Sequence, residues 1–204
     1  MAASEQFSVD RAKQLREGVR RAYSAAAEQP TGEHPFPVGR AFAASVGYPA
    51  DLLSTLPPVA VDSFAGVSNV SLWADIRPGD SVLDLGCGAG LDSLIAARRA
   101  GETGKVTGVD FSTPMLERAR RAAQEGGTLH AEFVQSDAEK LPVPDESIDL
   151  AIVNGIFNLN PARTAIFTEL ARVIRSGGSL AVAELILREP LPPEVVASDA
   201  SWLA

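Results

Sequence analysis

The sequence predicts an α/β fold built on a parallel sheet of five strands. From "RPGD" (77–80) onward, short apolar segments rich in β-branched residues alternate with helical patterns, which is typical of parallel strands joined by crossover helices. A glycine-rich segment, "GCGAG", directly follows the first of these apolar segments. The length of 204 residues and the hydrophobic content of 46% are sufficient for one substantial core. We therefore expect a sheet domain over 78–204.

The segment 1–77 is expected to form an N-terminal helical cap with a lid. A helical pattern over 8–28 includes Leu15, Val19 and Tyr23 and ends before Pro30. The next stretch, "QPTGEHPFPVGR", is rich in proline and predicts an ordered loop or lid. Short helices interrupted by prolines follow, and a further helix is expected near 68–76.

The elements of the sheet domain follow in order from the same patterns. Ser112 or Thr113 can cap the second of its helices, and Pro114 suits a first helical turn. Asn160 and Pro161 are expected to begin the last helix, and "SGG" is expected to stop it. The expected strands are 81–85, 105–110, 131–137, 147–155 and 179–187, and the expected helices are about 91–100, one starting after "FSTP" (111–114), and about 160–175.

Charge and composition exclude several classes of function. A formal net charge of -8 would repel a phosphate backbone, so nucleic acid is not expected as a partner. No secretory-type segment and no apolar run of membrane-spanning length is present, so we expect a soluble cytoplasmic protein. The single cysteine, Cys87, excludes an internal disulfide and a multi-cysteine metal cluster, and no metal site is expected.

The stretch "VLDLGCGAGLD" (82–92) predicts a ligand held close to the main chain, because glycine has no Cβ and tolerates positive φ. Its glycines are Gly86, Gly88 and Gly90, and Leu91 stands where the third glycine of the dinucleotide fingerprint would fall. The spacing disfavours a nicotinamide-dependent oxidoreductase but does not by itself exclude it.

Polar side chains end the next strands at the edge where parallel sheets bind ligands. Asp110 ends the second strand, where a carboxylate can accept hydrogen bonds from two ribose hydroxyls. Asp137 ends the third strand, with Ala138 behind it, where an adenine could lie. Asn154 ends the fourth strand beside the topological switch point. This agreement is more specific than the glycines alone.

Four segments, "VLDLGCGAG", "VTGVDFSTPMLERAR", "SDAEKLPVPDESIDL" and "VIRSGGSLAVAE", resemble the successive motifs of the class I methyltransferases, which use S-adenosylmethionine. The resemblance covers about residues 78–187 and implies a Rossmann-like sheet. It also implies that Asp84 and the glycine loop surround the methionine end, that Asp110 binds the ribose, that Met115 lies near the adenosine, and that Asp137 and Ala138 lie at the adenine. The expected cofactor-binding residues are Asp84, Gly86, Cys87, Gly88, Gly90, Asp92, Asp110, Phe111, Met115, Asp137, Ala138 and Asn154.

A finer resemblance links "GYPADLLSTLP", "SFAGVSNV", "GAGLDSLIAARRAG" and "NGIFNLNPAR" to the arsenite methyltransferases. In that family one cysteine precedes the first strand and another follows the asparagine that ends the fourth. Val67 and Gly155 stand at these positions, and a third family cysteine lies C-terminal of the segment where this chain stops. Valine and glycine cannot replace thiolate ligands of trivalent arsenic. The resemblance therefore implies a relative with a different substrate, although a name given by homology could still say arsenite.

The expected reaction is in-line displacement of a methyl group from the cofactor sulfonium to a small-molecule acceptor, for which alignment in a dry pocket is the main requirement. His34 is a candidate base, although a structural hydrogen bond in its loop is the favoured interpretation. Tyr23 could pack in its helix or cover the cofactor. A cofactor-binding partner protein without activity remains an alternative. The candidates for the acceptor pocket are Tyr23, Val67, Gly155 and Asn158.

The fifth strand is expected to leave an open sheet edge. Class I methyltransferases usually continue with a helix and an antiparallel hairpin, but only "REPLPPEVVASDASWLA" follows the strand here, so we expect this hairpin to be missing. Exposed edges are normally covered or paired. Three explanations stay open: the sequence is truncated, a partner such as a second copy in a homo-oligomer covers the edge, or the tail with Trp202 and Leu203 wraps over it together with the N-terminal helices.

Overall fold

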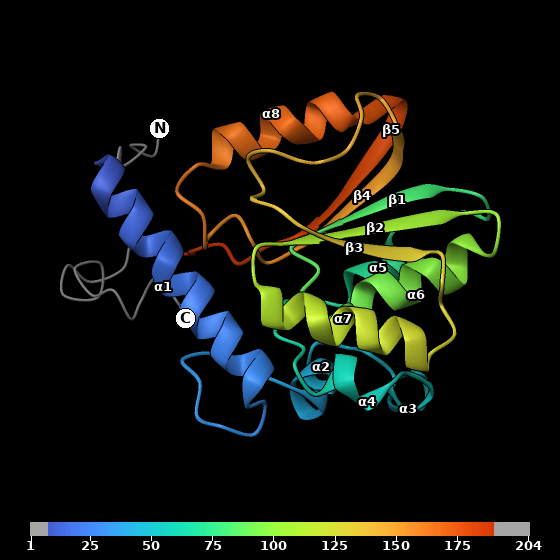
Figure 1. The fold of residues 1–204 in the computed structure, drawn as a ribbon, viewed down its shortest axis with the longest axis horizontal. Coiled ribbons are helices and arrows are strands. Elements are labelled where there is room, and N and C mark those ends of the chain that lie inside the picture. The colour runs from blue at the N-terminus through green and yellow to red at the C-terminus, as the bar shows by residue number, and fades with distance from the viewer. Residues whose placement is uncertain (1–7, 190–204) are drawn as a thin grey trace.

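The computed structural model describes residues 8–189 and contains a five-stranded parallel sheet with the order β3-β2-β1-β4-β5 (Figure 1). The predicted fold class is confirmed. The order reverses between β1 and β4, which creates a crevice at the carboxyl ends of these strands. The strands are β1 (Ser81–Leu85), β2 (Lys105–Asp110), β3 (Ala131–Gln135), β4 (Ile148–Asn154) and β5 (Ile174–Ala183).

Helices cover both faces of the sheet (Figure 1). The helices α5, α6 and α7 lie on one face and α8 lies on the other, while α2, α3 and α4 form an outer layer below α7. The first helix, α1, lies beside the end of the sheet at which the strands terminate. The helices are α1 (Val9–Glu28), α2 (Arg40–Ser45), α3 (Ala50–Thr55), α4 (Pro58–Val61), α5 (Val70–Trp73), α6 (Leu91–Ala100), α7 (Thr113–Glu125) and α8 (Arg163–Val173).

Two hydrophobic clusters, one on each side of the sheet, hold these layers together. The larger cluster joins the sheet to α6 and α7 and includes Val82, Leu94 and Leu116. The second joins the sheet to α8 and includes Leu83 and Ile166. Neighbouring residues of β1 point into opposite clusters because side chains alternate along a strand. Burial on both faces explains why β1 and β4 are mainly apolar, with Ser81 and Asp84 in β1 and Asp149 and Asn154 in β4 as the polar residues.

The N-terminal helices share the larger cluster with the sheet, since Tyr48 and Leu53 belong to it. The end of α1 is held by Arg118 of α7, whose Nη1 donates to the carbonyl oxygen of Ala27 at 3.0 Å. The hydroxyl groups of Ser24 and Ser112 lie 2.9 Å apart and connect the same two helices. The C-terminal part of α1 is therefore fixed to α7, while the division of the chain at residue 77 stays a prediction.

Several predicted boundaries are wrong. The strand β3 ends at Gln135, so Asp137 lies in the loop after it, and β5 covers Ile174–Ala183 instead of 179–187. The helix expected near 68–76 is only α5, and the last helix begins and ends inside the expected range of 160–175. The "SGG" segment does not precede the fifth strand but lies within β5, where Gly177 has a φ of 77°. The strand register jumps from Ile148 opposite Ile174 to Leu150 opposite Ser179, so these glycines form a bulge.

In the described part of the chain, β5 pairs with β4 alone and is an edge of the sheet. The tail after residue 189, which includes Trp202 and Leu203, lies outside the described residues, and the three explanations for the edge stay open. No helix between residues 8 and 189 combines the length and hydrophobicity needed to cross a bilayer.

Candidate functional site

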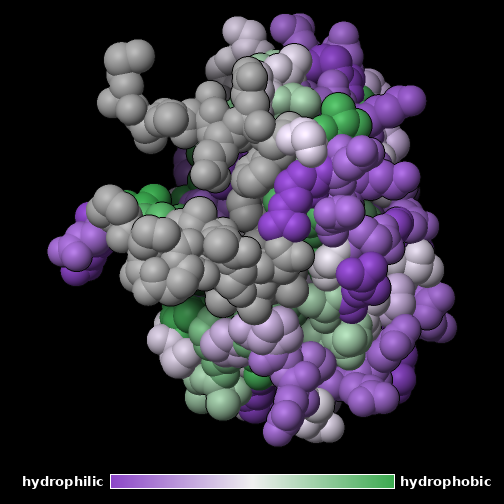
Figure 2. Space-filling model, turned by 90° about the vertical axis from the view of Figure 1, so that its left-hand side faces the viewer, coloured by the Kyte–Doolittle hydropathy of each residue, from purple (hydrophilic) through white to green (hydrophobic). Residues whose placement is uncertain are grey.

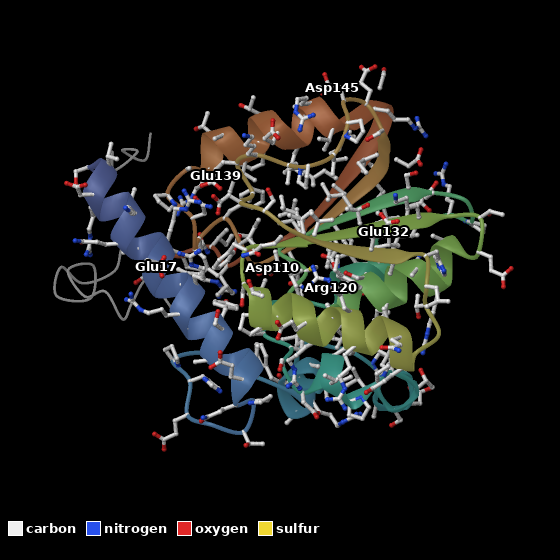
Figure 3. All side chains as sticks on the ribbon, in the orientation of Figure 1. Glu17, Asp110, Arg120, Glu132, Glu139 and Asp145 are labelled. Atoms are coloured by element: carbon white, nitrogen blue, oxygen red, sulfur yellow. The ribbon has the colours of Figure 1, made fainter. Side chains whose placement is uncertain are left out.

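A cavity of about 990 Å³ opens at the carboxyl ends of β1, β2 and β4, beneath α1. Asp110 and Glu139 lie on the side of the sheet that faces α1, and Glu17 extends from α1 (Figure 3). Figure 2 shows the molecule from this side. Around the residues drawn in grey, most of the visible residues are hydrophilic, and the hydrophobic ones form small groups. Of the predicted site residues, Tyr23, Asp84, Gly86, Cys87, Gly88, Asp92, Asp110, Phe111, Met115, Asp137, Ala138, Asn154 and Gly155 line the cavity.

The glycine loop requires glycine at its first position for two reasons. Gly86 has a φ of 76°, and a Cβ there would lie 2.3 Å from Cγ2 of Ile156. The main-chain amide of Gly88 donates to Oδ2 of Asp110 at 2.9 Å. The loop is therefore held against both the end of β2 and the segment after β4, and its main chain forms part of the cavity wall.

Asp110 is buried, and its carboxylate is held by main-chain amides. Its Oδ1 accepts from the amide of Ser112 at 2.8 Å, and its Oδ2 accepts from Gly88. Burial raises the pKa of Asp110, while these amide donors act in the opposite direction. Three main-chain amides, of Ser112, Gly88 and Phe111, bond to this carboxylate. Because a carboxylate offers about four acceptor positions, capacity remains for a ligand hydroxyl group.

Besides Asp110, the site holds a buried acidic pair at the loop, Asp84 and Asp92. Burial, and after it the negative charge of Asp92, raises the pKa of Asp84 well above its usual value. Asp84 accepts a hydrogen bond from the hydroxyl of Ser93. No cation is among the hydrogen-bonding partners of Asp84, Asp92 or Asp110 in the described structure. This side of the cavity is suited to a ligand that carries positive charge.

Asn154 connects three segments that are distant in the sequence. Its Oδ1 accepts from the amides of Val67 at 2.9 Å and Ser68 at 3.1 Å. Its Nδ2 donates to the carbonyl oxygen of Ser68 at 2.7 Å and to Oδ2 of Asp92 at 2.8 Å. The other oxygen of Asp92 accepts from the hydroxyls of Tyr48 and Ser71. Asn154 therefore positions the wall of the cavity, a function that its place at a strand end did not reveal.

Gly90, Val67, His34 and Asn158 do not line the cavity. Gly90 precedes α6 in a left-handed conformation and packs against Ala119. His34 bonds through Nε2 to the carbonyl oxygen of Gln29 at 2.9 Å, which is the structural alternative considered for it. The amide side chain of Asn158 donates to the carbonyl of Leu185. His34 is thus not placed to act as a base.

Val67 and Gly155 lie against each other although they are far apart in the sequence. A Cβ built on Gly155 would be 3.7 Å from Cβ of Val67 and 2.9 Å from its Cγ1. The two positions at which the resemblance to arsenite methyltransferases implies cysteines are therefore adjacent here and carry Val67 and Gly155. Cys87 cannot substitute for them, because its buried thiol packs near Gly108 and burial raises its pKa well above the usual value.

The sequence did not indicate Arg16 and Glu139, which also line the cavity. Arg16 bonds to Oδ1 of Asp137 at 2.9 Å and to Oε1 of Glu139 at 3.2 Å, and it thereby links α1 to the loop after β3. Oε2 of Glu139 is buried and has no hydrogen-bond partner among the described residues. Within residues 8–189, no group of three or more acidic, histidine or cysteine side chains is arranged to hold a metal ion.

The fold and cavity agree with the comparison to known protein families. A sequence model described as a methyltransferase domain matches residues 76–203. The chain belongs to the methyltransferase family. The cofactor of this family and of its structural neighbours is S-adenosylmethionine, so the predicted cofactor is confirmed.

Individual relatives show the same resemblance. The chain is 36% identical over 150 residues to an arsenite methyltransferase of Halobacterium salinarum, covering 74% of this chain and 38% of the relative. It therefore spans well under half of the length of that relative. A crystal structure of an arsenic(III) S-adenosylmethionine methyltransferase from Chlamydomonas reinhardtii matches with a TM-score of 0.61 and 30% identity, covering 82% of this chain and 57% of that one. The predicted resemblance to arsenite methyltransferases is confirmed.

A third relative has a different named activity. The crystal structure of the cyclase SpnF matches with a TM-score of 0.55 and 30% identity, covering 59% of this chain and 44% of that chain. The family resemblance therefore does not by itself decide the reaction, which has to be argued from the site.

Proposed function

We propose that the chain transfers a methyl group from S-adenosylmethionine to a small-molecule acceptor other than arsenite. The observation that carries this proposal is the cavity at the carboxyl ends of β1, β2 and β4, with the glycine loop and Asp110 on its wall. In this proposal Asp110 accepts hydrogen bonds from the ribose, and Asp137 and Ala138 bind the adenine. Asp84 and the loop bind the methionine end.

The cofactor supplies a methyl group that the positive sulfonium already makes electrophilic. The residues of the chain have to align the acceptor and exclude water, which can supply about 7–11 kcal/mol of the barrier reduction. Gly155, Ile156 and Phe64 line the cavity and contribute to the dry wall, while Val67 packs against Gly155 outside the lining. Tyr23 lines the cavity and stacks on Phe36 with ring centroids 4.3 Å apart.

Tyr23 is proposed to donate a hydrogen bond to a bound ligand rather than to act as a base. Burial, and then the negative charges of Asp110 and Glu184, raise its pKa far above the usual value. Its hydroxyl therefore keeps its proton at neutral pH. With His34 bonded to Gln29 outside the cavity, the site offers no histidine base among the described residues. An acceptor that is already nucleophilic without deprotonation fits this site best.

The absence of arsenic ligands supports an acceptor other than arsenite. Trivalent arsenic binds thiolates, whereas the two adjacent positions carry Val67 and Gly155, and Cys87 is a single buried thiol that lies near Gly108. The relationship to arsenite methyltransferases then reflects a shared scaffold with exchanged acceptor residues.

Calorimetry with S-adenosylmethionine, S-adenosylhomocysteine and a nicotinamide dinucleotide tests the cofactor part of the proposal. We expect the two adenosyl ligands to bind and the dinucleotide not to bind. A release assay for S-adenosylhomocysteine with a panel of hydroxyl, amine and thiol acceptors tests the transfer part. Binding without release for any acceptor would favour a second function, a cofactor-binding protein with other chemistry, which the cyclase relative makes a specific alternative.

A further inference from the structure

The bridge formed by Arg16 joins two carboxylates on a loop to a helix of the cap. The Asp137 side chain is 61% exposed, whereas that of Glu139 is 15% exposed. Asn160 also donates from Nδ2 to Oε1 of Glu139 at 3.2 Å. One oxygen of Glu139 therefore has two donors, while the other, Oε2, is buried without any among the described residues.

A buried carboxylate oxygen without a donor is unfavourable, and such an atom in a folded protein calls for an explanation. A guanidinium group and a carboxylate normally form two parallel hydrogen bonds, one for each oxygen. Arg16 instead divides its two terminal nitrogens between Asp137 and Glu139. The unsatisfied oxygen is the one that a two-point pairing of Arg16 with Glu139 would satisfy.

We propose that Arg16 is a positioning residue that releases Asp137 when the cofactor binds and pairs with both oxygens of Glu139 instead. This inference rests on the proposed function, in which Asp137 binds the adenine, and it takes the 6-amino group as the donor to that carboxylate. In the exchange Asp137 replaces one donor, Nη2 of Arg16, with another, the amino group. The freed N–H of Arg16 moves to Oε2 of Glu139, so no donor is lost and the unsatisfied oxygen gains one.

The exchange connects cofactor binding to the position of α1. The C-terminal end of this helix is fixed by Arg118 and Ser112, and Arg16 lies eight residues before Ser24, about 12 Å along the helix axis. The ion pairs of Arg16 with Asp137 and Glu139 hold the N-terminal half of α1 to the loop after β3. The pairing of Arg16 thus sets how α1 covers the cavity in the free and the cofactor-bound chain.

Glu139→Gln is the decisive variant, because glutamine keeps one acceptor oxygen but places an NH2 group where the second oxygen stood. Binding of S-adenosylhomocysteine should weaken about two- to fivefold, the change that corresponds to one partly exposed ion pair. The same substitution should have no effect in an Arg16→Gln background. Glu139→Gln should also have no effect on binding of the analogue that carries purine in place of adenine. That ligand lacks the 6-amino group, so it leaves Asp137 paired with Arg16.

Arg121→Gln is the control. Arg121 pairs with Glu125 on the same helix, α7, does not line the cavity and cannot link α1 to the loop. This control should leave the affinity for S-adenosylhomocysteine and the affinity for its purine analogue unchanged. Thermal unfolding should confirm that each variant is folded. Equal weakening of both ligands by Glu139→Gln, or the same weakening with and without Arg16, would overturn the exchange while the proposed function stands. Failure of the unmodified chain to bind S-adenosylhomocysteine would overturn both.

Discussion

The two sides of the cavity are held in different ways. On the cofactor side, defined as the glycine loop with Asp84 and Asp110, the contacting residues are near each other in the sequence. Gly88 and Asp110 are 22 positions apart, and Asp84 and Ser93 are nine apart. On the acceptor side, defined as 66–68 and 154–156, Asn154 bonds to Val67 over 87 positions. The cofactor side is thus specified by compact motifs and the acceptor side by the tertiary fold.

This difference explains why one side carries the family resemblance while the other departs from it. A motif that binds its ligand through main-chain amides and one carboxylate cannot vary much without loss of binding. A wall formed by side chains from distant segments can exchange residues in pairs as long as their volumes fit. The predictions below test that division.

The largest expected effect is a gain of arsenic binding on the acceptor side. The double substitution Val67→Cys and Gly155→Cys would place two thiols at Cβ positions that now lie 3.7 Å apart. We expect calorimetry to show one trivalent arsenical bound to each chain of the double variant and none to the unmodified chain. We do not expect turnover of arsenite by either.

The single variant Val67→Cys is the control for this experiment, because one added thiol cannot form the pair. Gly155→Cys will cost stability, since residue 155 has a φ of 81°, a conformation that costs a side chain about 1–3 kcal/mol. Methylation of arsenite by the unmodified chain would contradict the assignment of residues 67 and 155 as the exchanged ligands.

Asn154→Ala should lower the free energy of unfolding by about 2–4 kcal/mol, because it removes the acceptor for two amides and a donor to buried Asp92. Urea denaturation measures the change. Asn160→Ala is the matched control, since Asn160 also bonds to an amide and a carboxylate but near the surface of the site. If both alanine variants lose the same stability, the acceptor side does not depend on Asn154 in particular.

Asp110→Ala should weaken binding of S-adenosylhomocysteine by about 10- to 100-fold, which corresponds to the loss of charge-assisted hydrogen bonds worth about 1.5–3 kcal/mol. Asp137→Ala should have a smaller effect, because its carboxylate is largely exposed and screened by water. Calorimetry on the folded variants measures both. An unchanged affinity for Asp110→Ala would remove the ribose assignment.

The smallest effect is on the pH dependence of stability. Burial raises the pKa of Asp84, Asp92 and Asp110, so the folded chain binds protons that the unfolded chain does not. Stability should therefore rise as the pH falls toward the usual carboxyl pKa, and pH 8 to 5 is the range in which to measure the rise.

Two other acids act in the opposite direction but at lower pH. The side-chain hydrogen bond from Arg172 lowers the pKa of Glu169 to about 2, and the amide of Ser81 lowers that of Asp149. The stability that Glu169 and Asp149 contribute is lost only as the pH falls through and below the usual carboxyl pKa range. That range lies outside the window of pH 8 to 5. Urea denaturation of Asp84→Asn should show a weaker rise over that window. A slope equal to that of the unmodified chain would show that Asp84 does not titrate there.

The predictions from sequence were accurate where local patterns determine structure. The expected first strand and its helix coincide with β1 and α6, and the expected second strand coincides with β2. The bulge at Gly177 was misread because a glycine pair after a helix resembles a helix stop. Arg16 and Glu139 were missed because each is an ordinary surface residue in the sequence. Their partners become neighbours only when α1 packs beside the sheet.

The side-chain amide of Asn154 bonds only to main-chain atoms of residues 67 and 68. Any residue other than proline at position 67 offers the same amide, so the path of the chain there does not depend on which side chain it carries. Mutations at this position can therefore change what packs against Gly155 without displacing the wall. Residue 67 is thus a starting point for a library that selects for new acceptors, because a larger or smaller side chain there would reshape the cavity through Gly155 while the main chain keeps its path.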